Sequence, residues 1–339
     1  MTRQDCSFNP SLAMHHPNAL RFHKFSPGGN TTILVTDPVP VRLRAAVAAE
    51  LMGEHHVHAE QVGFVSLAGA RPRIDMMGGE FCGNACRSLA ALLALKRVLV
   101  AGPGGLMSGE IESSGVDGPL PVRVVLTAQG PDAAVRMPLP IPLPPVTGNA
   151  PGGKDASEGK GAPYGMSAGA GNAAPTGNAP PCAPDLSRMV THLGQGLALV
   201  RLPGIAHLLL DAALHPFPEA WRDRARGLID LHGLSGEPAA GCIWHHGSLA
   251  APGITPVVCV RDTGSIILES ACGSGSLAYG LLRAASGDGE ISLAVRQPSG
   301  AAIRVSVTRR DGLTPEAWIG GAVRHVASGT AYLYGDGAA

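Results

Sequence analysis

Two segments that each begin at a cysteine constrain the fold of this chain more than any other feature. Cys82 and Cys272 are each followed by a glycine and a small polar residue, and then by apolar residues at helical spacing. The first segment reads Cys-Gly-Asn-Ala-Cys-Arg-Ser-Leu-Ala-Ala-Leu-Leu, and the second reads Cys-Gly-Ser-Gly-Ser-Leu-Ala-Tyr-Gly-Leu-Leu. The pattern predicts an α-helix starting at each cysteine and suggests two lobes related by an internal repeat.

A segment of different composition separates the two predicted helices. Residues 147–183 consist largely of Gly, Ala, Pro, Ser and Asn. Such a segment buries too little apolar surface to offset the entropy lost on ordering. We therefore predict a disordered insertion at 147–183 and a disordered N-terminus at 1–19. Short β-like runs lie on both sides of the insertion and indicate α+β units, for example 32–35, 122–126, 256–260 and 303–307.

The charge balance excludes several classes of partner. Lysine and arginine number 26, and aspartate and glutamate also number 26, so the chain has no general attraction for nucleic acid or anionic membrane. The first residues contain no apolar signal-peptide core, and no run reaches the length of a membrane span. We expect a cytoplasmic protein that acts on a small molecule, with no nucleic-acid or membrane partner and a homodimer as the candidate assembly.

The cysteines do not form a disulfide or zinc pattern. There are 7 of them without a dense framework, so we expect mostly reduced thiols. Cys82 and Cys86 lack a second pair at zinc-finger spacing, and no metal site is predicted. Cys86, Cys242 and Cys259 lie in apolar segments and are expected to be core thiols. The glycines after Cys272 lack the spacing of a dinucleotide-binding loop, so we expect no cofactor.

The residues after each cysteine suit a reactive thiol at a helix start. Glycine lets a ligand approach the backbone closely, and we expect Asn84 or Ser274 to cap the helix that follows. Unpaired N–H groups and the helix dipole there stabilise a thiolate or hold a substrate carboxylate. Inverting a stereocentre by proton transfer requires an acid and a base on opposite faces of one carbon, and two thiols satisfy that symmetry. Buried core cysteines are the alternative interpretation, but the matching contexts of Cys82 and Cys272 favour function.

Two carboxylates lie near the cysteines in the sequence. Glu80 is two residues before Cys82, and Glu269 is three residues before Cys272. Each carboxylate is a candidate for binding a substrate ammonium group. Each is equally suited to a purely structural role beside the positive end of its neighbouring helix.

Three histidines, His207, His245 and His246, are further candidates for a pocket. They lie in hydrophobic strand regions, where a histidine is more often a packing residue than a ligand. Adjacent residues on a strand point to opposite faces, so His245 and His246 are not expected to bind a metal together.

Four motifs, in this order, resemble the diaminopimelate epimerase superfamily. They begin at Phe22 (Phe-His-Lys-Phe-Ser-Pro-Gly-Gly-Asn), Gly78 (Gly-Gly-Glu-Phe-Cys-Gly-Asn-Ala-Cys-Arg), Pro203 (Pro-Gly-Ile-Ala-His) and Glu269 (Glu-Ser-Ala-Cys-Gly-Ser-Gly-Ser). The resemblance implies an α+β fold of two similar lobes, each a β-barrel-like sheet around a central helix, with the active site in the cleft between them. It also implies an isomerase that uses neither pyridoxal phosphate nor a metal.

The resemblance further implies that the first lobe is discontinuous. The family's closing strand is matched by residues 318–333, which would return to the first lobe. The predicted first lobe therefore comprises 20–129 and 319–335. The predicted second lobe comprises 130–146 and 184–318.

Roles for individual residues also follow from the resemblance. Cys82 and Cys272 match the family's acid and base, and Asn30 matches an asparagine that contacts the substrate. The helix-start amides that hold the α-carboxylate are matched by Gly83, Asn84, Gly273 and Ser274.

Two departures from the superfamily pattern concern the substrate. Ile205 stands where diaminopimelate epimerases carry an asparagine that helps hold the distal amino-acid group. Thr263 and Gly264 stand where they carry a Glu-Arg pair. The motifs are closer in style to the histidine racemases of opine-type, staphylopine-like metallophore biosynthesis. We therefore predict histidine racemisation by proton transfer between a thiolate and a thiol.

Other functions on the same fold form the alternatives. A diaminopimelate epimerase, a proline or hydroxyproline racemase, or a phenazine-type isomerase would be enzymes of related architecture. An amino-acid-binding protein or a thiol redox protein would be the non-enzyme alternatives. The presence of both Cys82 and Cys272 favours catalysis by a thiol pair.

Deletion of residues 147–181 is expected to leave folding and turnover nearly intact, because Gly, Ala and Pro without apolar periodicity provide no core. Circular dichroism and an activity assay on the shortened chain check this. Loss of soluble protein would show instead that the segment packs against the rest of the molecule.

Overall fold

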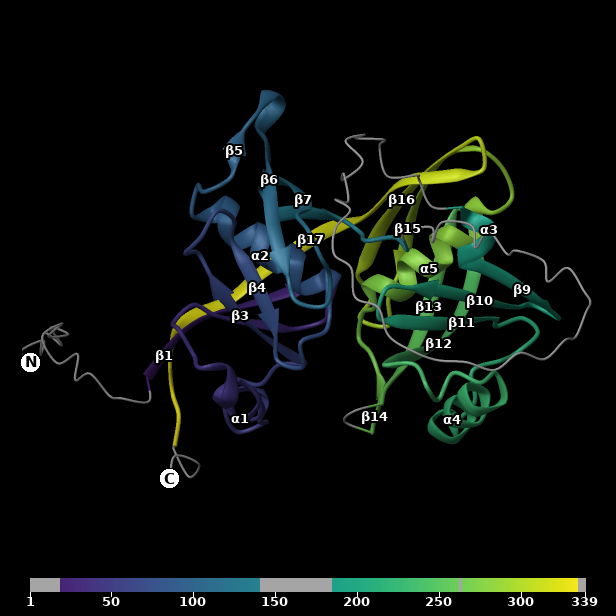
Figure 1. Cartoon of the computed structure of the whole chain (residues 1–339), viewed down its shortest axis with the longest axis horizontal. Coiled ribbons are helices and arrows are strands. Elements are labelled where there is room, and N and C mark those ends of the chain that lie inside the picture. The colour runs from purple at the N-terminus through teal and green to yellow at the C-terminus, as the bar shows by residue number, and fades with distance from the viewer. Residues whose placement is uncertain (1–18, 141–184, 262–263, 335–339) are drawn as a thin grey trace, which may run out of the picture.

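A computed structural model describes residues 19–140, 185–261 and 264–334 of the chain. The predicted disordered segment 147–183 lies outside these residues, as does 1–19 except for its last residue. Figure 1 shows two lobes side by side, joined by a long C-terminal strand. The first lobe contains β1 (Ala19–Pro27), β2 (Thr32–Val35), α1 (Val41–Met52), β3 (Gln61–Ser66), β4 (Arg73–Met76), α2 (Gly83–Leu95), β5 (Val100–Ala101), the 3₁₀ turn η2 (Pro103–Gly105), β6 (Leu106–Ser113), β7 (Leu120–Thr127) and β8 (Gly130–Arg136).

The remaining elements build the second lobe and the strand that leaves it. They are α3 (Leu186–Met189), β9 (Val190–Gly194), β10 (Leu197–Leu202), β11 (Ile205–Asp211), α4 (Trp221–Leu231), β12 (Ala239–Ser248), β13 (Ala251–Val260), β14 (Ser265–Leu268), α5 (Gly273–Ala284), β15 (Gly289–Arg296), β16 (Ala302–Arg310) and β17 (Leu313–Tyr332). Strands dominate both halves, and the expected α+β class is confirmed.

The strand pairing repeats in the same order in both lobes. In the first, β1 and β2 are antiparallel, β2 and β3 are parallel across α1, β3 and β4 are antiparallel, and β4 and β6 are parallel across α2. In the second, β10–β11, β11–β12 across α4, β12–β13, and β13–β15 across α5 follow the same sequence of directions. The internal repeat expected from the two cysteine segments is therefore confirmed at the level of topology.

The helices α2 and α5 form the centres of their lobes. Every residue from Gly83 to Ala94 is buried, and most of α5 is buried as well. A helix that is covered on all sides needs apolar or small residues all round, which the Leu and Ala content of both segments provides. The outer helices α1 and α4 bury only one stripe each. Within the described residues, no helix is both long and apolar enough to cross a membrane.

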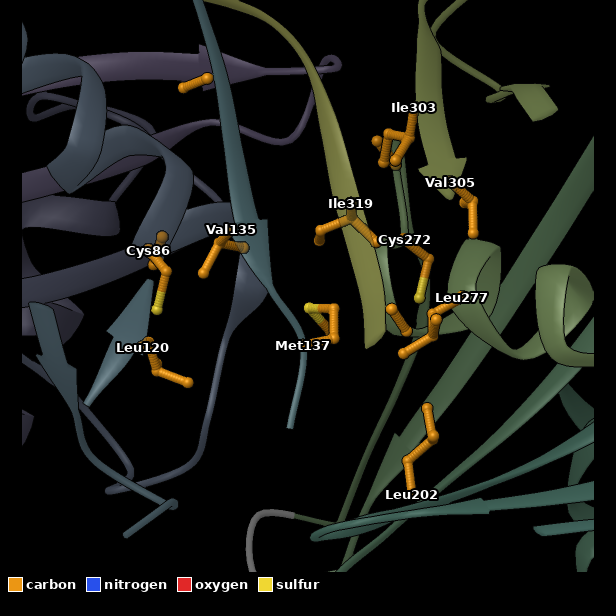
Figure 2. Close-up of a cluster of buried hydrophobic side chains, with 14 of the residues drawn as sticks. Cys86, Leu120, Val135, Met137, Leu202, Cys272, Leu277, Ile303, Val305 and Ile319 are labelled. Carbon is orange, nitrogen blue, oxygen red and sulfur yellow. The ribbon is translucent and has the colours of Figure 1, made fainter. Parts of the chain in front are cut away.

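The junction between the lobes is built by β8 and β17. The first part of β17 pairs with β16, the segment from Trp318 to Ala322 also pairs with β8, and the last part pairs with β1. One apolar cluster runs through this junction, and Figure 2 shows Ile319 and Met137 in it, between Cys86 of α2 and Cys272. The predicted lobe boundaries at 129/130 and 318/319 stay predictions, and β8, which lies after the first of them, pairs with β7 of the first lobe.

Arg87 fastens α2 to the two junction strands from a fully buried position. Its Nε donates to the carbonyl oxygen of Ala133 in β8 at 3.0 Å, and its Nη2 donates to that of Ala322 in β17 at 3.3 Å. Its Nη1 donates to Oδ1 of Asn84 at 3.1 Å. Burial lowers the pKa of the guanidinium to about 10, so it remains charged at neutral pH.

Replacement of this arginine tests how much the junction depends on it. Arg87→Met is expected to lower the free energy of unfolding by about 3 kcal/mol, because it removes three hydrogen bonds to buried acceptors. Urea unfolding measures the change. The matched control is Arg42→Met on the exposed surface of α1, which should change stability by less than about 0.5 kcal/mol. Equal effects of the two substitutions would contradict the role of Arg87.

Candidate active site

The two predicted cysteines occupy equivalent helix starts. Cys82 is the N-cap of α2, where its Sγ accepts a hydrogen bond from Ala85 N at 3.5 Å. Cys272 is the N-cap of α5, where its Sγ accepts from Gly275 N at 3.2 Å. The expectation that Asn84 or Ser274 would cap these helices is wrong. The sulfur atoms take the cap position, which places each sulfur beside a backbone N–H at the positive end of a helix.

The two helix starts approach the same side chain of β17. A Cβ added at Gly83 would lie 2.7 Å from Cδ1 of Ile319, and one added at Gly273 would lie 2.8 Å from that atom. Glycine at both positions therefore lets the two helix starts pack against Ile319 without displacing the end of its side chain. Asn84 connects the helix starts directly, since its Nδ2 donates to the carbonyl oxygen of Ala271 at 3.3 Å. The structure thus brings Cys82 and Cys272 to opposite sides of one junction between the lobes.

A loop of the first lobe also contacts the second lobe beside Cys272. Gly29 has a φ of 107°, and a Cβ there would lie 2.2 Å from the Cβ of Ser299. Ser299 Oγ donates to the carbonyl oxygen of Gly28 at 2.6 Å, and Ser299 N donates to that of Ser270. This contact fixes the loop that carries Asn30 against the second cysteine segment.

On the first-lobe side, an amide network surrounds Cys82. The thiol donates to Oε1 of Gln61 at 3.2 Å. Gln61 Nε2 donates to Oδ1 of Asn30 at 2.5 Å and to Oγ1 of Thr32 at 2.8 Å. Asn30 Nδ2 in turn donates to Glu60 Oε2 at 3.0 Å. Because two acceptors engage the Gln61 amino group, its carbonyl oxygen is oriented toward the thiol.

On the second-lobe side, Cys272 is held through its backbone and its neighbour. Gln297 Oε1 accepts from Cys272 N at 2.9 Å. Ser274 Oγ lies 3.5 Å from Cys272 Sγ and 2.9 Å from Nε2 of His207. Burial lowers the pKa of His207 to about 3, so the imidazole is neutral at neutral pH. Its fully buried position fits a packing residue, and the contact with Ser274 also ties it to the site.

The carboxyl group of Glu269 acts on both thiols. Burial raises the pKa of Cys82 to about 11, and the charges of Glu80 and Glu269 add to this effect. Burial raises the pKa of Cys272 well above its ordinary value, as do the charge of Glu269 and a hydrogen bond with it. The pKa of Glu269 is itself raised to about 7, chiefly by burial and also by the charge of Glu60. At neutral pH both cysteines are therefore thiols, beside a carboxyl group close to its own titration point.

The other residues predicted from the sequence lie beside the two thiols, except for Glu80, which is exposed. Gly83, Asn84, Gly273 and Ser274 form the first turns of the two helices, and Asn30 belongs to the Gln61 network. Glu80 is exposed, whereas Glu269 is half-buried beside Cys272. Gln61, Gln297 and Glu60 were not predicted. Within the described part of the chain, no group of three or more His, Cys, Asp or Glu side chains is placed to hold a metal ion.

Comparison with known proteins identifies a family and several relatives by sequence. The chain matches the family described as "Histidine racemase CntK N-terminal domain" over residues 19–154 and 187–332. A histidine racemase of Fusobacterium nucleatum is 44% identical over 78 residues, which are 23% of this chain and 28% of that protein. A histidine racemase of Staphylococcus aureus is 41% identical over 73 residues, covering 20% of this chain and 27% of that protein. The chain thus matches only about a quarter of the length of these curated relatives.

A solved structure shows the same fold at low sequence identity. The probable proline racemase from Agrobacterium radiobacter K84 aligns with a TM-score of 0.57 and 11% identity, over 94% of this chain and 93% of that one. The fold of this chain is therefore similar to the fold of that structure.

The raised pKa of Glu269 predicts a pH-dependent contribution to stability. A carboxyl group whose pKa rises from an ordinary 4.5 to about 7 on folding favours the folded state fully below pH 4.5 and loses that contribution as the pH rises through 7. The unfolding free energy of the natural chain minus that of Glu269→Gln should therefore decrease as the pH rises from 4.5 through about 7. Urea unfolding at several pH values measures it. Parallel profiles for the two proteins would contradict the raised pKa.

Proposed function

Because the chain belongs to the histidine racemase CntK N-terminal domain family, we propose that it is an isomerase that racemises histidine. In this proposal Cys82 and Cys272 exchange the α-hydrogen as a proton, one thiol acting from each face of the carbon, without an organic cofactor or a metal. The observation that carries the proposal is the pair of sulfur-capped helix starts, which meet at the junction of two lobes with the same topology. Family membership and the named relatives support histidine as the substrate.

The first turns of α2 and α5 supply a site for the substrate carboxylate. Helix geometry leaves the earliest amides of each helix without an intrahelical acceptor, and the dipoles of both helices favour an anion there. The groups proposed to hold the α-carboxylate are the backbone amides of Gly83, Asn84, Gly273 and Ser274. We assign the substrate ammonium to Glu80, whose charge also acts on Cys82, because Glu269, half-buried beside Cys272, is the group that takes the proton of that thiol.

The proton transfer starts from Cys272 in this proposal. The charge of Glu269 acts on that thiol, and in its carboxylate form Glu269 accepts the thiol's proton. The resulting thiolate, stabilised by the Gly275 N–H, removes the α-proton, and the electron pair of the broken C–H bond delocalises toward the bound carboxylate. The Cys82 thiol then donates its proton to the opposite face, and a new C–H bond forms. The reverse reaction exchanges the two roles.

Several broader features accompany the proposal. We propose that each sheet closes as a barrel around its central helix, α2 or α5, because both helices are buried on nearly every side. Function through two free thiols requires a reducing compartment, which favours the cytoplasm. The proposed partner is the amino-acid substrate, and a homodimer is the candidate assembly. The motifs resemble those of histidine racemases in metallophore biosynthesis, so we propose that pathway as the use of the product.

Single thiol replacements test the assignment of the acid and the base. Cys82→Ala and Cys272→Ala should each reduce conversion of L-histidine to D-histidine by about 100-fold or more, because a positioned acid or base contributes at least that much. Chiral chromatography measures the product, and circular dichroism checks the fold. Cys259→Ala, at a half-buried thiol in β13, is the matched control and should remain active.

The same assay decides the substrate. LL-diaminopimelate should be converted poorly, because Ile205 occupies the position where a polar group would hold its second amino-acid end. Efficient conversion of diaminopimelate, with histidine unchanged, would contradict the proposed specificity. Full activity of either thiol variant would contradict the two-thiol mechanism.

A further inference from the structure

A cavity lies on the second lobe, and the proposed proton transfer does not use it. Its volume is about 560 Å³. Asp211 at the end of β11, His245 of β12, and Tyr279 and Arg283 of α5 line it. Tyr279 follows Cys272 by seven residues, so at about 1.5 Å per residue the cavity begins roughly 10 Å along the helix from the thiol. The cavity is therefore separate from the cysteine pair, although both are built on α5.

Arg283 brings a guanidinium group to this cavity. Its Nε atom is buried and has no hydrogen-bond partner among the described residues. A buried N–H without an acceptor is unfavourable, and a guanidinium can only donate. The Nε atom itself is out of a ligand's reach, but the guanidinium that carries it lines the cavity, and a ligand carboxylate matches the remaining N–H groups particularly well.

The internal repeat shows that the fold does not require these polar residues. The aligned N-caps Cys82 and Cys272 place Tyr279 and Arg283 at the positions of Leu89 and Leu93 in α2. Both leucines are fully buried in the core of the first lobe. The second lobe thus has a phenol and a guanidinium where its counterpart has apolar packing, which indicates a function other than support of the fold.

The other lining groups favour a ligand with two charges. Asp211 supplies a carboxylate, whose Oδ1 accepts from Ala213 N at 3.0 Å. A simple anion at Arg283 would be repelled by this group, whereas a ligand that also carries a cation would pair with both. The His245 ring lies against the buried Tyr279 ring, with the two centroids 5.3 Å apart and the planes tilted by 42°. The half-buried face of His245 is the surface offered to a ring or an apolar side chain.

We propose that this cavity is a second binding site, which takes a free α-amino acid as its zwitterion. The ligand carboxylate pairs with Arg283, its ammonium group pairs with Asp211, and its side chain lies against His245 and Tyr279. The site does not depend on the proposed racemase activity. It places a bound amino acid on the same helix that positions Cys272.

Nuclear magnetic resonance of ring-labelled histidines tests this site directly. The full chain carrying Cys82→Ala and Cys272→Ala is used, so that turnover does not consume the probe, and His245→Gln assigns the signal of interest. L-Histidine should shift the His245 signal saturably. Histamine and imidazolepropionate, which lack the carboxylate and the ammonium group respectively, should each bind at least about tenfold more weakly, because each leaves one charged partner unmatched.

Substitutions in the cavity complete the test. Arg283→Gln should weaken the response to L-histidine by at least about tenfold, and Arg226→Gln on the exposed face of α4 should leave it unchanged. Tyr279→Leu with Arg283→Leu introduces the apolar pair of the first lobe and should abolish the response in a folded protein. Absence of a saturable shift, or an unchanged response in Arg283→Gln, would overturn the proposal. Binding of imidazolepropionate as tightly as L-histidine would show an anion site instead.

Discussion

The close approach of two helix N-termini is the constraint on which the rest of the structure depends. The dipoles of α2 and α5 both present their positive ends at one junction, an arrangement that is unfavourable unless negative charge or acceptors lie between them. The thiol sulfurs of Cys82 and Cys272 accept from the helix amides, the carbonyl oxygen of Ala271 accepts from Asn84 of the other helix, and the Glu269 carboxyl group lies nearby. The glycines that follow both cysteines favour the approach, because a Cβ at either position would push against the end of the Ile319 side chain.

Burial and helix amides act on the thiols in opposite directions. Burial favours the neutral thiol, and the N–H groups at the caps favour the thiolate. The pKa of both groups is raised, so burial dominates in the chain without substrate. The two sides of the junction also differ, since Cys82 donates to the neutral amide of Gln61, whereas Cys272 is influenced by the charge of Glu269. A topologically repeated scaffold thus holds two thiols in chemically different surroundings, and our proposal uses this difference in taking Cys272 as the first base.

The sequence was sufficient to predict what is encoded locally. The Cys-Gly-polar starts and the apolar spacing predicted both helices and the repeat, because glycine and helical periodicity act over a few residues. The caps were predicted wrongly, since sulfur is a weak acceptor and Asn84 and Ser274 are the usual capping types. Gln61 was missed because it lies 21 residues before Cys82, and only the pairing of β2 with β3 brings it to the thiol. Gln297 was missed for the same reason. His207 was named as a candidate, but its contact with Ser274 depends on tertiary structure that no local pattern specifies.

The central claim is that the two thiols act on opposite faces of one carbon, and solvent isotope incorporation tests it most directly. L-Histidine is incubated with the enzyme in deuterium oxide, and both enantiomers are separated and analysed by mass spectrometry before one-tenth conversion. The account predicts that the D-histidine formed carries deuterium from the opposite thiol, while the remaining L-histidine stays protiated. D-Histidine that retains the original hydrogen, or L-histidine that is labelled as fast as product appears, would indicate a single base and contradict the account.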